Sequence, residues 1–415
     1  MRILQLSTHS TLAPRHGGQF RSHHIGRCLE LAGFAISRIA VCWRTEHDLD
    51  DAREPIIDVR QTNYWSSATY QAALAWGPYF ADYYGAFAVA DTPHLKNELY
   101  EKIAVAKPDV ILLEHPWTWL LVKTLPDVTS GAVRVVYSSQ NVEALLKRRI
   151  ARAAGLTVPE DLLAAVEAFE RGLVTSAWAT VACTPTDAEI FSSWGAARVV
   201  VANNGAVRKR RDNLLRALPP PLSPEIRFAL VVGSSHPPNV SGFFKFVVPG
   251  LWRLPPHERI VIAGSMCDSI NAQISASPLR HYQDRRLVSL GFVDELVLDA
   301  LLANASAILL PVEYGGGSNV KTAEALSTGR PVIATRSAFR GFAEYQTLSS
   351  VTLADTPEAF ETAIRRALSE PPTDLKCIEP PRELLWEATL EPLIALLRSN
   401  PVGGSHGPVG YIATQ

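Results

Sequence analysis

The chain has 415 residues, of which 47% are hydrophobic and 20% are charged, and its formal net charge is −1. This length allows two domains, or three, each large enough for a core of its own. The near-zero charge excludes the strong basic field that many nucleic-acid-binding proteins carry, so we expect no nucleic-acid partner.

Cysteine usage and the lack of long apolar runs lead us to expect a cytoplasmic protein. The five cysteines lie far apart, without CxxC pairs or zinc-ligand spacing, and fit buried free thiols in a reducing compartment better than a disulfide framework. The opening residues lack the apolar stretch of a signal peptide, and no run approaches the ~18–20 apolar residues of a membrane span. A peripheral contact with the inner face of a membrane stays open.

Strand-like and helical segments alternate along the first half of the chain. Residues 2–7 are typical of a strand, HGG at 16–18 of a turn, and residues 20–33 of a helix with Phe20, His24, Cys28 and Leu31 near one face. Strand-like runs follow at 35–43, 109–115, 134–139, 179–184 and 198–205. With helices between the strands, this alternation predicts a doubly wound parallel sheet.

The pattern is interrupted once and then repeats. Charged residues and then prolines fill residues 208–226, as in a domain linker. We therefore predict an α/β fold of two Rossmann-like domains, at 1–207 and 227–380, followed by a closing helix at 381–399 and a flexible tail at 400–415. Ligands bind such sheets beyond the carboxyl ends of the strands, and two such edges are expected to face each other across a cleft.

The stretch EYGGGSNVKTAEALSTGRPVIAT, residues 313–335, predicts a glycine loop and a short helix between two strands. Free N–H groups and the dipole at such a helix start favour phosphate, and glycines let an anion approach. Ser318 or Asn319 would cap the helix, with Glu324 about two turns in, roughly 8–9 Å along the axis, which suits a ribose. The alternative is a surface turn with Lys321 and Glu324 paired on an exposed face.

Ordered fragments from Met1 to about Leu397 add a family resemblance. They are HGGQFRSHHIGRCLELAG, DVILLEHP, VVYSSQNVE, VACTPTDAEIF, VVVANNGAV, VVGSSHPPNVSG, the segment from VSLGFVDELV to GRPVIAT, and LLWEATLEPLI. Together they resemble the retaining glycosyltransferases of family 4, which have the GT-B architecture. The resemblance implies transfer of a sugar from a nucleoside-diphosphate sugar to a saccharide or lipid-linked saccharide, in bacterial surface polysaccharide or glycoconjugate synthesis. It implies no cofactor beyond this donor and no metal.

The resemblance also implies roles for single residues. Glu324 would bind the ribose hydroxyls, and the backbone at Ser318 and Asn319 would hold the diphosphate together with Lys321. The implied catalytic group is Lys321, Glu324 and Gln140. The implied donor-binding residues are Gly17 and Gly18 in the loop after the first strand, Gly233, Ser234 and Asn239 in the turn after residue 232, and Glu313, Gly316, Gly317, Ser318, Asn319 and Val320.

Three positions depart from the family pattern. Gln140 stands where relatives commonly have a histidine, and an amide can bind a hydroxyl but carries no proton at neutral pH. Gly316 stands where a second glutamate is usual; Glu313 would replace it, or is simply a loop carboxylate. The turn GSSHPPN lacks the arginine and lysine that many relatives use for phosphate, so we expect Lys321 to take more of that charge.

Several alternatives remain. The DLD at Asp48–Asp50 matches a short metal motif of another glycosyltransferase architecture, but a solvated acidic stretch is the better interpretation. A nicotinamide dehydrogenase fits poorly, because no G-x-G-x-x-G follows a strand. A nucleotide-sugar epimerase of the same architecture, or a catalytically weak nucleotide-sugar-binding subunit, stays open.

The acceptor side is predicted from aromatic residues. Nine aromatics lie between Tyr64 and Phe87, and we expect Phe80 and Phe87 to be core. Tryptophan combines an apolar face with a polar tip, which suits a sugar ring or a lipid headgroup boundary, so Trp65 and Trp76 are expected to line the acceptor groove. His115 either points into the cleft at the end of its strand or caps that strand.

Overall fold

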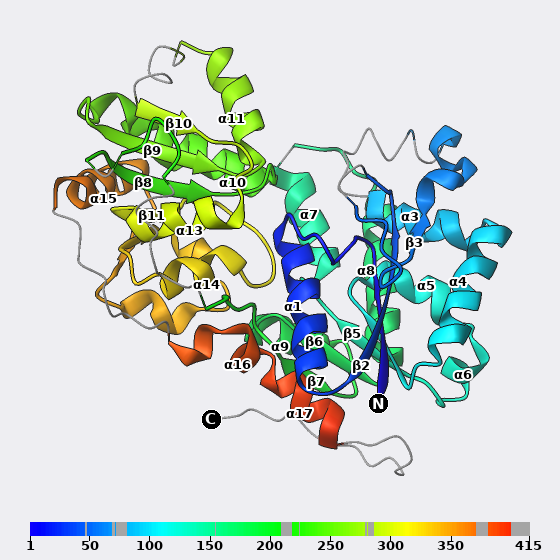
Figure 1. Ribbon diagram of the computed structural model, residues 1–415. Coiled ribbons are helices and arrows are strands. Elements are labelled where there is room, and N and C mark those ends of the chain that lie inside the picture. Colours follow the sequence, from blue (N-terminus) through cyan, green and yellow to red (C-terminus); the bar gives the residue numbers. More distant parts are fainter. Residues whose placement is uncertain are drawn as a thin grey trace. The chain divides into compact units, whose positions relative to one another are not determined.

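The computed structural model describes residues 1–45, 48–68, 71, 81–153, 155–208, 218–223, 225–278, 280, 286–370 and 381–399 (Figure 1). The chain divides into two compact units. Unit 1 contains Met1–Asn203, Gly316–Ser318 and Thr389–Gln415, and unit 2 contains Asn204–Gly315 and Asn319–Ala388. Among the described helices, none combines the length and the apolar character that a membrane span needs.

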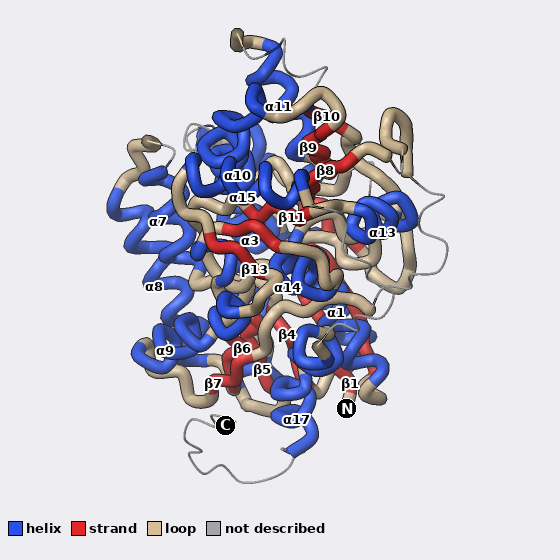
Figure 2. Tube along the Cα trace, turned by 90° about the vertical axis from the view of Figure 1, so that its left-hand side faces the viewer, coloured by secondary structure: helices blue, strands red, loops and turns tan. Residues whose placement is uncertain are grey.

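Unit 1 is built on a seven-stranded parallel sheet with the strand order β3-β2-β1-β4-β5-β6-β7. Its helices cover the sheet, and α7 and α8 pack against each other (Figure 2). The strands are β1 (Arg2–Ser7), β2 (Ala35–Cys42), β3 (Ile56–Asp58), β4 (Val110–Leu113), β5 (Arg134–Ser138), β6 (Ala179–Ala182) and β7 (Val199–Val201). The α-helices are α1 (Gly17–Leu31), α3 (Ala81–Ala90), α4 (Pro93–Ala106), α5 (Trp119–Val122), α6 (Pro126–Thr129), α7 (Glu143–Ala153), α8 (Glu160–Ser176), α9 (Pro185–Ser193) and α17 (Glu391–Ser399). Short 3₁₀ helices are η1 (Val59–Gln61), η2 (Asn63–Ser66) and η4 (Pro116–Thr118).

Unit 2 repeats this architecture with a six-stranded parallel sheet of order β10-β9-β8-β11-β12-β13. The strands are β8 (Arg227–Val232), β9 (Glu258–Ala263), β10 (Leu287–Ser289), β11 (Ala307–Leu310), β12 (Val332–Ala334) and β13 (Val351–Leu353). The α-helices are α10 (Pro237–Gly242), α11 (Met266–Ser275), α13 (Glu295–Asn304), α14 (Val320–Ser327), α15 (Pro357–Ser369) and α16 (Trp386–Thr389), which ends where the chain returns to unit 1. Further short helices are η6 (Phe243–Val247), η7 (Val248–Arg253), η8 (Arg336–Phe339), η9 (Ala343–Thr347) and η10 (Arg382–Leu384). The prediction of two doubly wound parallel-sheet domains is confirmed.

The strands of unit 2 are apolar on both faces because helices cover both faces of the sheet. Successive side chains of a strand point to opposite faces. In β11, Ala307 and Leu309 belong to one hydrophobic cluster, and Ile308 and Leu310 belong to the other. Burial on both sides therefore explains why AILL carries no polar residue.

Two expected elements differ from the structure. The helix predicted to begin after an HGG turn already begins at Gly17, because the Nδ1 atom of His16 accepts the N–H of Gln19 and caps the helix. The predicted closing helix at 381–399 is divided into η10, α16 and α17. Most of the predicted linker and the whole predicted tail lie outside the described residues. Four cysteines, Cys28, Cys42, Cys183 and Cys267, are buried and form no disulfide among the described residues, and Cys377 lies outside them.

Candidate functional site

The carboxyl ends of β8 and β11 form the switch point of unit 2. β8 pairs with β9 on one side and with β11 on the other, so the strand order reverses between β8 and β11. The chain leaves these two strands for α10 and α14 respectively. Open α/β sheets bind ligands outside such a reversal point. The GSSHPPN turn and the start of α14 therefore lie at the edge where a ligand is expected.

α14 begins at Val320, with Asn319 as the residue before its first turn. The Asn319 side chain does not cap the helix but donates from Nδ2 to the carbonyl of Ala338 over 3.4 Å. The Thr322 hydroxyl donates to the same carbonyl over 2.6 Å. Helix geometry leaves the first N–H groups of α14 without intrahelical carbonyls. Because no side chain caps them, these groups are suited to an anion.

Lys321 and Glu324 lie three residues apart on α14 and therefore on one face of the helix. The Nζ atom of Lys321 donates to Oδ1 of Asn239 over 2.7 Å. The Nδ2 atom of Asn239 donates in turn to the carbonyl of Ser234 over 3.0 Å. This chain of hydrogen bonds holds the ammonium at the turn that follows β8.

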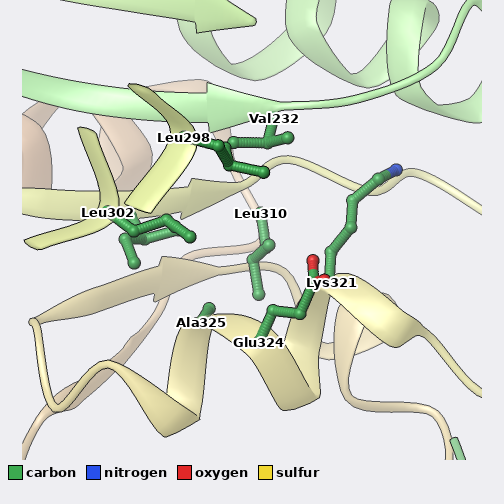
Figure 3. A pocket seen from close by; sticks show the side chains of 8 residues that line it. Val232, Leu298, Leu302, Leu310, Lys321, Glu324 and Ala325 are labelled. Carbon is green, nitrogen blue, oxygen red and sulfur yellow. The ribbon is translucent and has the colours of Figure 1, made fainter. Parts of the chain in front are cut away.

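A small pocket lies beside this pair. Its apolar side comes from the strand ends at Val232 and Leu310 and from Leu298 and Leu302 on α13 (Figure 3). Lys321, Glu324 and Ala325 line it from α14. In Figure 3 the Lys321 side chain carries its nitrogen away from the leucines, and the Glu324 carboxylate stands next to the Lys321 stem. An apolar wall with a carboxylate and an ammonium at one side suits a ligand that has both an apolar and a polar part.

The electrostatics of the pair set the charge state of the ammonium. Burial lowers the pKa of Lys321 to about 8, the neighbouring Glu324 carboxylate acts in the opposite direction, and Arg340 lowers the pKa further. At neutral pH the side chain is still mostly charged. It is a cation whose charge is poorly solvated, so an anion placed beside it would stabilise it.

Gly242, which the sequence analysis did not single out, sets the distance between the two halves of this site. A Cβ atom at this position would stand 1.7 Å from the carbonyl oxygen of Pro311, just after β11. Any side chain would therefore push α10 away from β11. The close approach keeps Asn239, on α10, within reach of Lys321 on α14. The sequence shows only a glycine at the end of the fragment VVGSSHPPNVSG, and the close contact at this position requires the folded chain.

The loop residues Glu313 and Gly315 have protein partners. Glu313 accepts a hydrogen bond from Nζ of Lys245 over 2.7 Å. A Cβ atom at Gly315 would meet the guanidinium of Arg340 at 2.4 Å. Glu313 thus forms an ion pair with Lys245 of η6. Of the two expectations for this residue, the pair agrees with a loop carboxylate rather than with a replacement for the missing glutamate. Gly316, Gly317 and Ser318 belong to unit 1 in the division of the chain.

The residues expected on the other domain gather within unit 1. Gly17 and Gly18 form the first turn of α1, so the expectation that they lie in a loop is wrong. The Nε2 atom of Gln140 donates to Oγ of Ser22 over 3.2 Å and to the carbonyl of Gly18 over 3.4 Å. His115 precedes η4 without capping it, and its Nδ1 atom lies 2.8 Å from Oγ1 of Thr8. Gly18, Gln140 and His115 are thus in one unit, and Lys321 and Glu324 are in the other.

The aromatic segment is only partly described. Trp76, Phe80 and the side chain of Trp65 lie outside the described residues. Tyr83 is buried and meets the ring of Trp117 edge-on at a centroid distance of 5.0 Å. Phe87, expected in the core, packs partly buried against the same cluster. The described end of the segment is therefore core, and the acceptor role of Trp65 and Trp76 stays a prediction.

Metal binding has no support among the described residues. No group of three or more histidine, cysteine, aspartate or glutamate side chains in these parts of the chain is arranged to hold an ion. Asp48 accepts hydrogen bonds from the backbone and hydroxyl of Thr45, and Asp50 pairs with Arg44 while 93% of its side chain is exposed. The DLD stretch thus serves a local turn and a solvated ion pair.

Comparison with known proteins gives the fold a name. Residues 226–370 match the family model described as glycosyl transferases group 1. A sucrose-phosphate synthase from Thermosynechococcus elongatus is similar at 14% identity, over 94% of this chain and 92% of that chain, with a TM-score of 0.63. A UDP-forming trehalose-phosphate synthase from Burkholderia xenovorans is similar at 14% identity, over 97% and 100%, with a TM-score of 0.60. Anabaena HepE in complex with UDP and glucose is similar at 14% identity, over 89% and 90%, with a TM-score of 0.59.

No curated protein sequence matches the chain. The fold is GT-B, and the domain match together with this fold supports a glycosyltransferase of the GT-B type.

Proposed function

We propose that the protein transfers a sugar from a nucleoside-diphosphate sugar to an acceptor hydroxyl and binds the donor at the carboxyl ends of β8 and β11. The observation that carries this proposal is the Lys321 ammonium, held 2.7 Å from Asn239 and next to the uncapped start of α14. A cation and helix N–H groups at one point favour a diphosphate. Glu324 stands one turn further along, where ribose hydroxyls can donate to its carboxylate.

The similar structures support a nucleotide-sugar donor. HepE has been solved with UDP-glucose, and a trehalose-6-phosphate enzyme from E. coli has been solved with UDP-2-fluoro glucose. A starch synthase from Arabidopsis thaliana has been solved with ADP and acarbose. These ligands differ in their base and share a diphosphate. We therefore assign this chain a nucleoside-diphosphate sugar and leave the base to experiment.

The finer features of the proposal follow from the resemblance to family 4. The transfer retains the anomeric configuration, and an oxygen of the leaving phosphate assists the incoming hydroxyl. Helix N–H groups and Lys321 stabilise the departing diphosphate in place of a metal ion. The acceptor is a saccharide or a lipid-linked saccharide of bacterial surface polysaccharide or glycoconjugate synthesis. The enzyme acts in the cytoplasm or at the inner membrane face, with Trp65 and Trp76 on the acceptor side.

Calorimetry with UDP, GDP and ADP tests the donor site. Glu324→Ala should weaken binding of the preferred diphosphate by ~1.5–3 kcal/mol, because a charged hydrogen-bond acceptor for the ribose is lost. Lys321→Ala should leave the affinity for the free nucleoside nearly unchanged, because the ammonium contacts only phosphate. Glu358→Ala, which removes an exposed carboxylate on α15, is the matched control. Equal affinity of the Glu324 variant and the control would remove the donor site from this edge.

Product analysis separates the proposal from its two rivals. Incubation of the nucleotide-sugar with candidate acceptors should yield the free nucleoside diphosphate and a glycosylated product. An epimerase would release a changed sugar without an acceptor, and a binding subunit would bind the donor without turnover. Either of these results, together with intact donor binding, would replace the transferase assignment.

A further inference from the structure

Three histidines of unit 1 meet at the carboxyl ends of β1 and β4. His9 lies in the loop after β1, His16 caps α1, and His115 follows β4. The ring of His9 meets that of His16 at a centroid distance of 5.4 Å and that of His115 at 5.2 Å, nearly edge-on in both cases. The spacing of positions 9, 16 and 115 along the chain gives no sequence signal for this cluster.

In two of these rings a hydrogen bond engages the Nδ1 atom. The Nδ1 atom of His16 accepts the N–H of Gln19, so the proton of the neutral ring is on Nε2. The Nδ1 atom of His115 faces the Thr8 hydroxyl at 2.8 Å, which leaves its Nε2 atom for another partner. His16 is exposed and His115 is partly exposed. The hydrogen bonds of both rings to other described residues are made at Nδ1, so both Nε2 atoms are open to a ligand.

Burial favours the uncharged form of all three histidines. Burial lowers the pKa of His9 well below its ordinary value, and His115 and His16 lower it further, whereas a hydrogen bond with the backbone of Gly18 raises it. Burial lowers the pKa of His115 to about 4, despite the opposing effect of Asp82. Burial also lowers the pKa of His16. Uncharged imidazoles do not attract an anion, but each has one donor and one acceptor nitrogen, as a hydroxyl group requires.

A buried carboxylate holds the loop that carries His9. Glu54, 3% exposed, lies between β2 and β3 and accepts hydrogen bonds from the Ser10 hydroxyl at 2.6 Å and from the N–H of Thr11 at 2.9 Å. It also accepts from the Thr11 hydroxyl and from the N–H of Leu12. Four donors on three consecutive residues fix the loop conformation immediately after His9. The histidine cluster is thus a positioned arrangement, as a binding site requires.

We propose that the Nε2 atoms of His16 and His115, with the His9 ring between them, form a binding site for neighbouring hydroxyl groups of a saccharide, and that Glu54 positions this site. The site itself requires only the geometry of unit 1. Its assignment to the acceptor sugar rests on the proposed function. A metal ion is the competing ligand for three histidines, and the described residues contain no arrangement that would hold one.

Nitrogen-15 NMR of the histidine side chains of the full chain provides the test. The probes are the methyl glycosides of glucose, galactose and mannose, added one at a time, and ZnCl₂ in a separate sample. We expect at least one glycoside to shift the Nε2 signals of His16 and His115 in a saturable way. His94 and His257 are exposed and serve as internal controls. Equal shifts at the controls, no shift with any glycoside, or zinc binding in preference to sugars would overturn the proposal.

Two substitutions separate binding from positioning. His115→Gln keeps a neutral polar side chain and should weaken the affinity for the glycoside about two- to tenfold, the range for one lost hydrogen bond. Glu54→Gln should weaken the affinity for the glycoside similarly, although it replaces none of the histidines. The reason is that an amide cannot accept hydrogen bonds from all four donors of the loop. Asp51→Asn removes a carboxylate from the same β2–β3 connection that pairs only locally with Arg53, and should have no effect.

The outcomes also separate this inference from the proposed function. UDP affinity measured on the same variants should stay at the wild-type value, because Lys321 and Glu324 belong to unit 2. Glycoside binding without any nucleotide binding would keep the histidine site and remove the transferase assignment. Nucleotide binding with unshifted histidine signals would do the reverse. If His115→Gln does not fold, Glu54→Gln and the wild-type titration still decide the matter.

Discussion

Replacing Lys321 by methionine should stabilise the free protein at neutral pH and weaken its affinity for a nucleoside diphosphate. The two effects have one cause, the burial that lowers the pKa of Lys321 from 10.5 to about 8. At 1.36 kcal/mol per pH unit, keeping this ammonium charged in the fold costs roughly 3 kcal/mol at pH 7. Methionine removes that cost and keeps an unbranched side chain on α14.

The sign and the size of the gain follow from the two states. The unfolded chain binds the lysine proton more tightly than the folded chain, so the cost is fully present below pH 8 and disappears as the pH rises toward 10.5. The substitution also removes the hydrogen bond to Asn239, which is worth about 1.5–3 kcal/mol for a charged donor. We therefore expect a net gain of about 1 kcal/mol at pH 7 and none near pH 10.

The affinity of the wild-type protein for a diphosphate should fall as the pH rises. A bound diphosphate favours the ammonium, so the affinity of the wild-type protein for UDP should fall about tenfold from pH 7 to pH 9, as the free protein loses the Lys321 proton. Calorimetry over this range and thermal unfolding of both proteins are the measurements. A methionine variant that is less stable at pH 7, or that shows the same fall in affinity with pH, would refute the role given to this lysine.

Three further outcomes are expected. Gly242→Ala should destabilise the protein by at least ~2 kcal/mol, because its Cβ would meet the Pro311 carbonyl at 1.7 Å, whereas Gly172→Ala, on α8 with open space around it, should be neutral or stabilising by thermal unfolding. Burial and Glu143 raise the pKa of Glu170 from 4.5 to about 8, so the melting temperature should fall as the pH rises from about 4.5 to 8, and Glu170→Gln should remove this slope. Transferase activity, once a donor and acceptor pair is found, should survive an excess of EDTA; a strict requirement for a divalent ion would contradict the proposed phosphate site.

The fold could be predicted because the sequence of each strand and helix is sufficient to indicate that element. Strands buried on both faces need apolar residues throughout, and segments such as Val110–Leu113 are buried along their whole length. The helix α1 begins at Gly17, three residues before the predicted start at residue 20, and the reason is again local. Helix caps are expected from serine, threonine, aspartate or asparagine, and here an imidazole nitrogen of His16 takes that role.

The candidate site could be predicted only where its members share one element. Lys321 and Glu324 are three residues apart, and helical spacing places them on one face without further information. Glu54 and Thr11 are separated by 43 positions, and only the folded chain brings the carboxylate to that loop. The same holds for His9 and His115. Nothing in the spacing of these residues indicates that they meet.

The turn after β8 illustrates how a missing residue can be replaced from elsewhere in the fold. The resemblance leads one to expect an arginine and a lysine in this turn, and the sequence has Ser234 and Asn239 among its residues instead. Asn239 does not bring a charge, but its side-chain oxygen holds the ammonium of Lys321, which comes from α14, 82 positions later. A positive charge is therefore present beside the turn although the turn itself has none. The sequence shows that the turn lacks the expected arginine and lysine. That Lys321 supplies a charge instead depends on the close contact that Gly242 permits between α10 and the residue after β11.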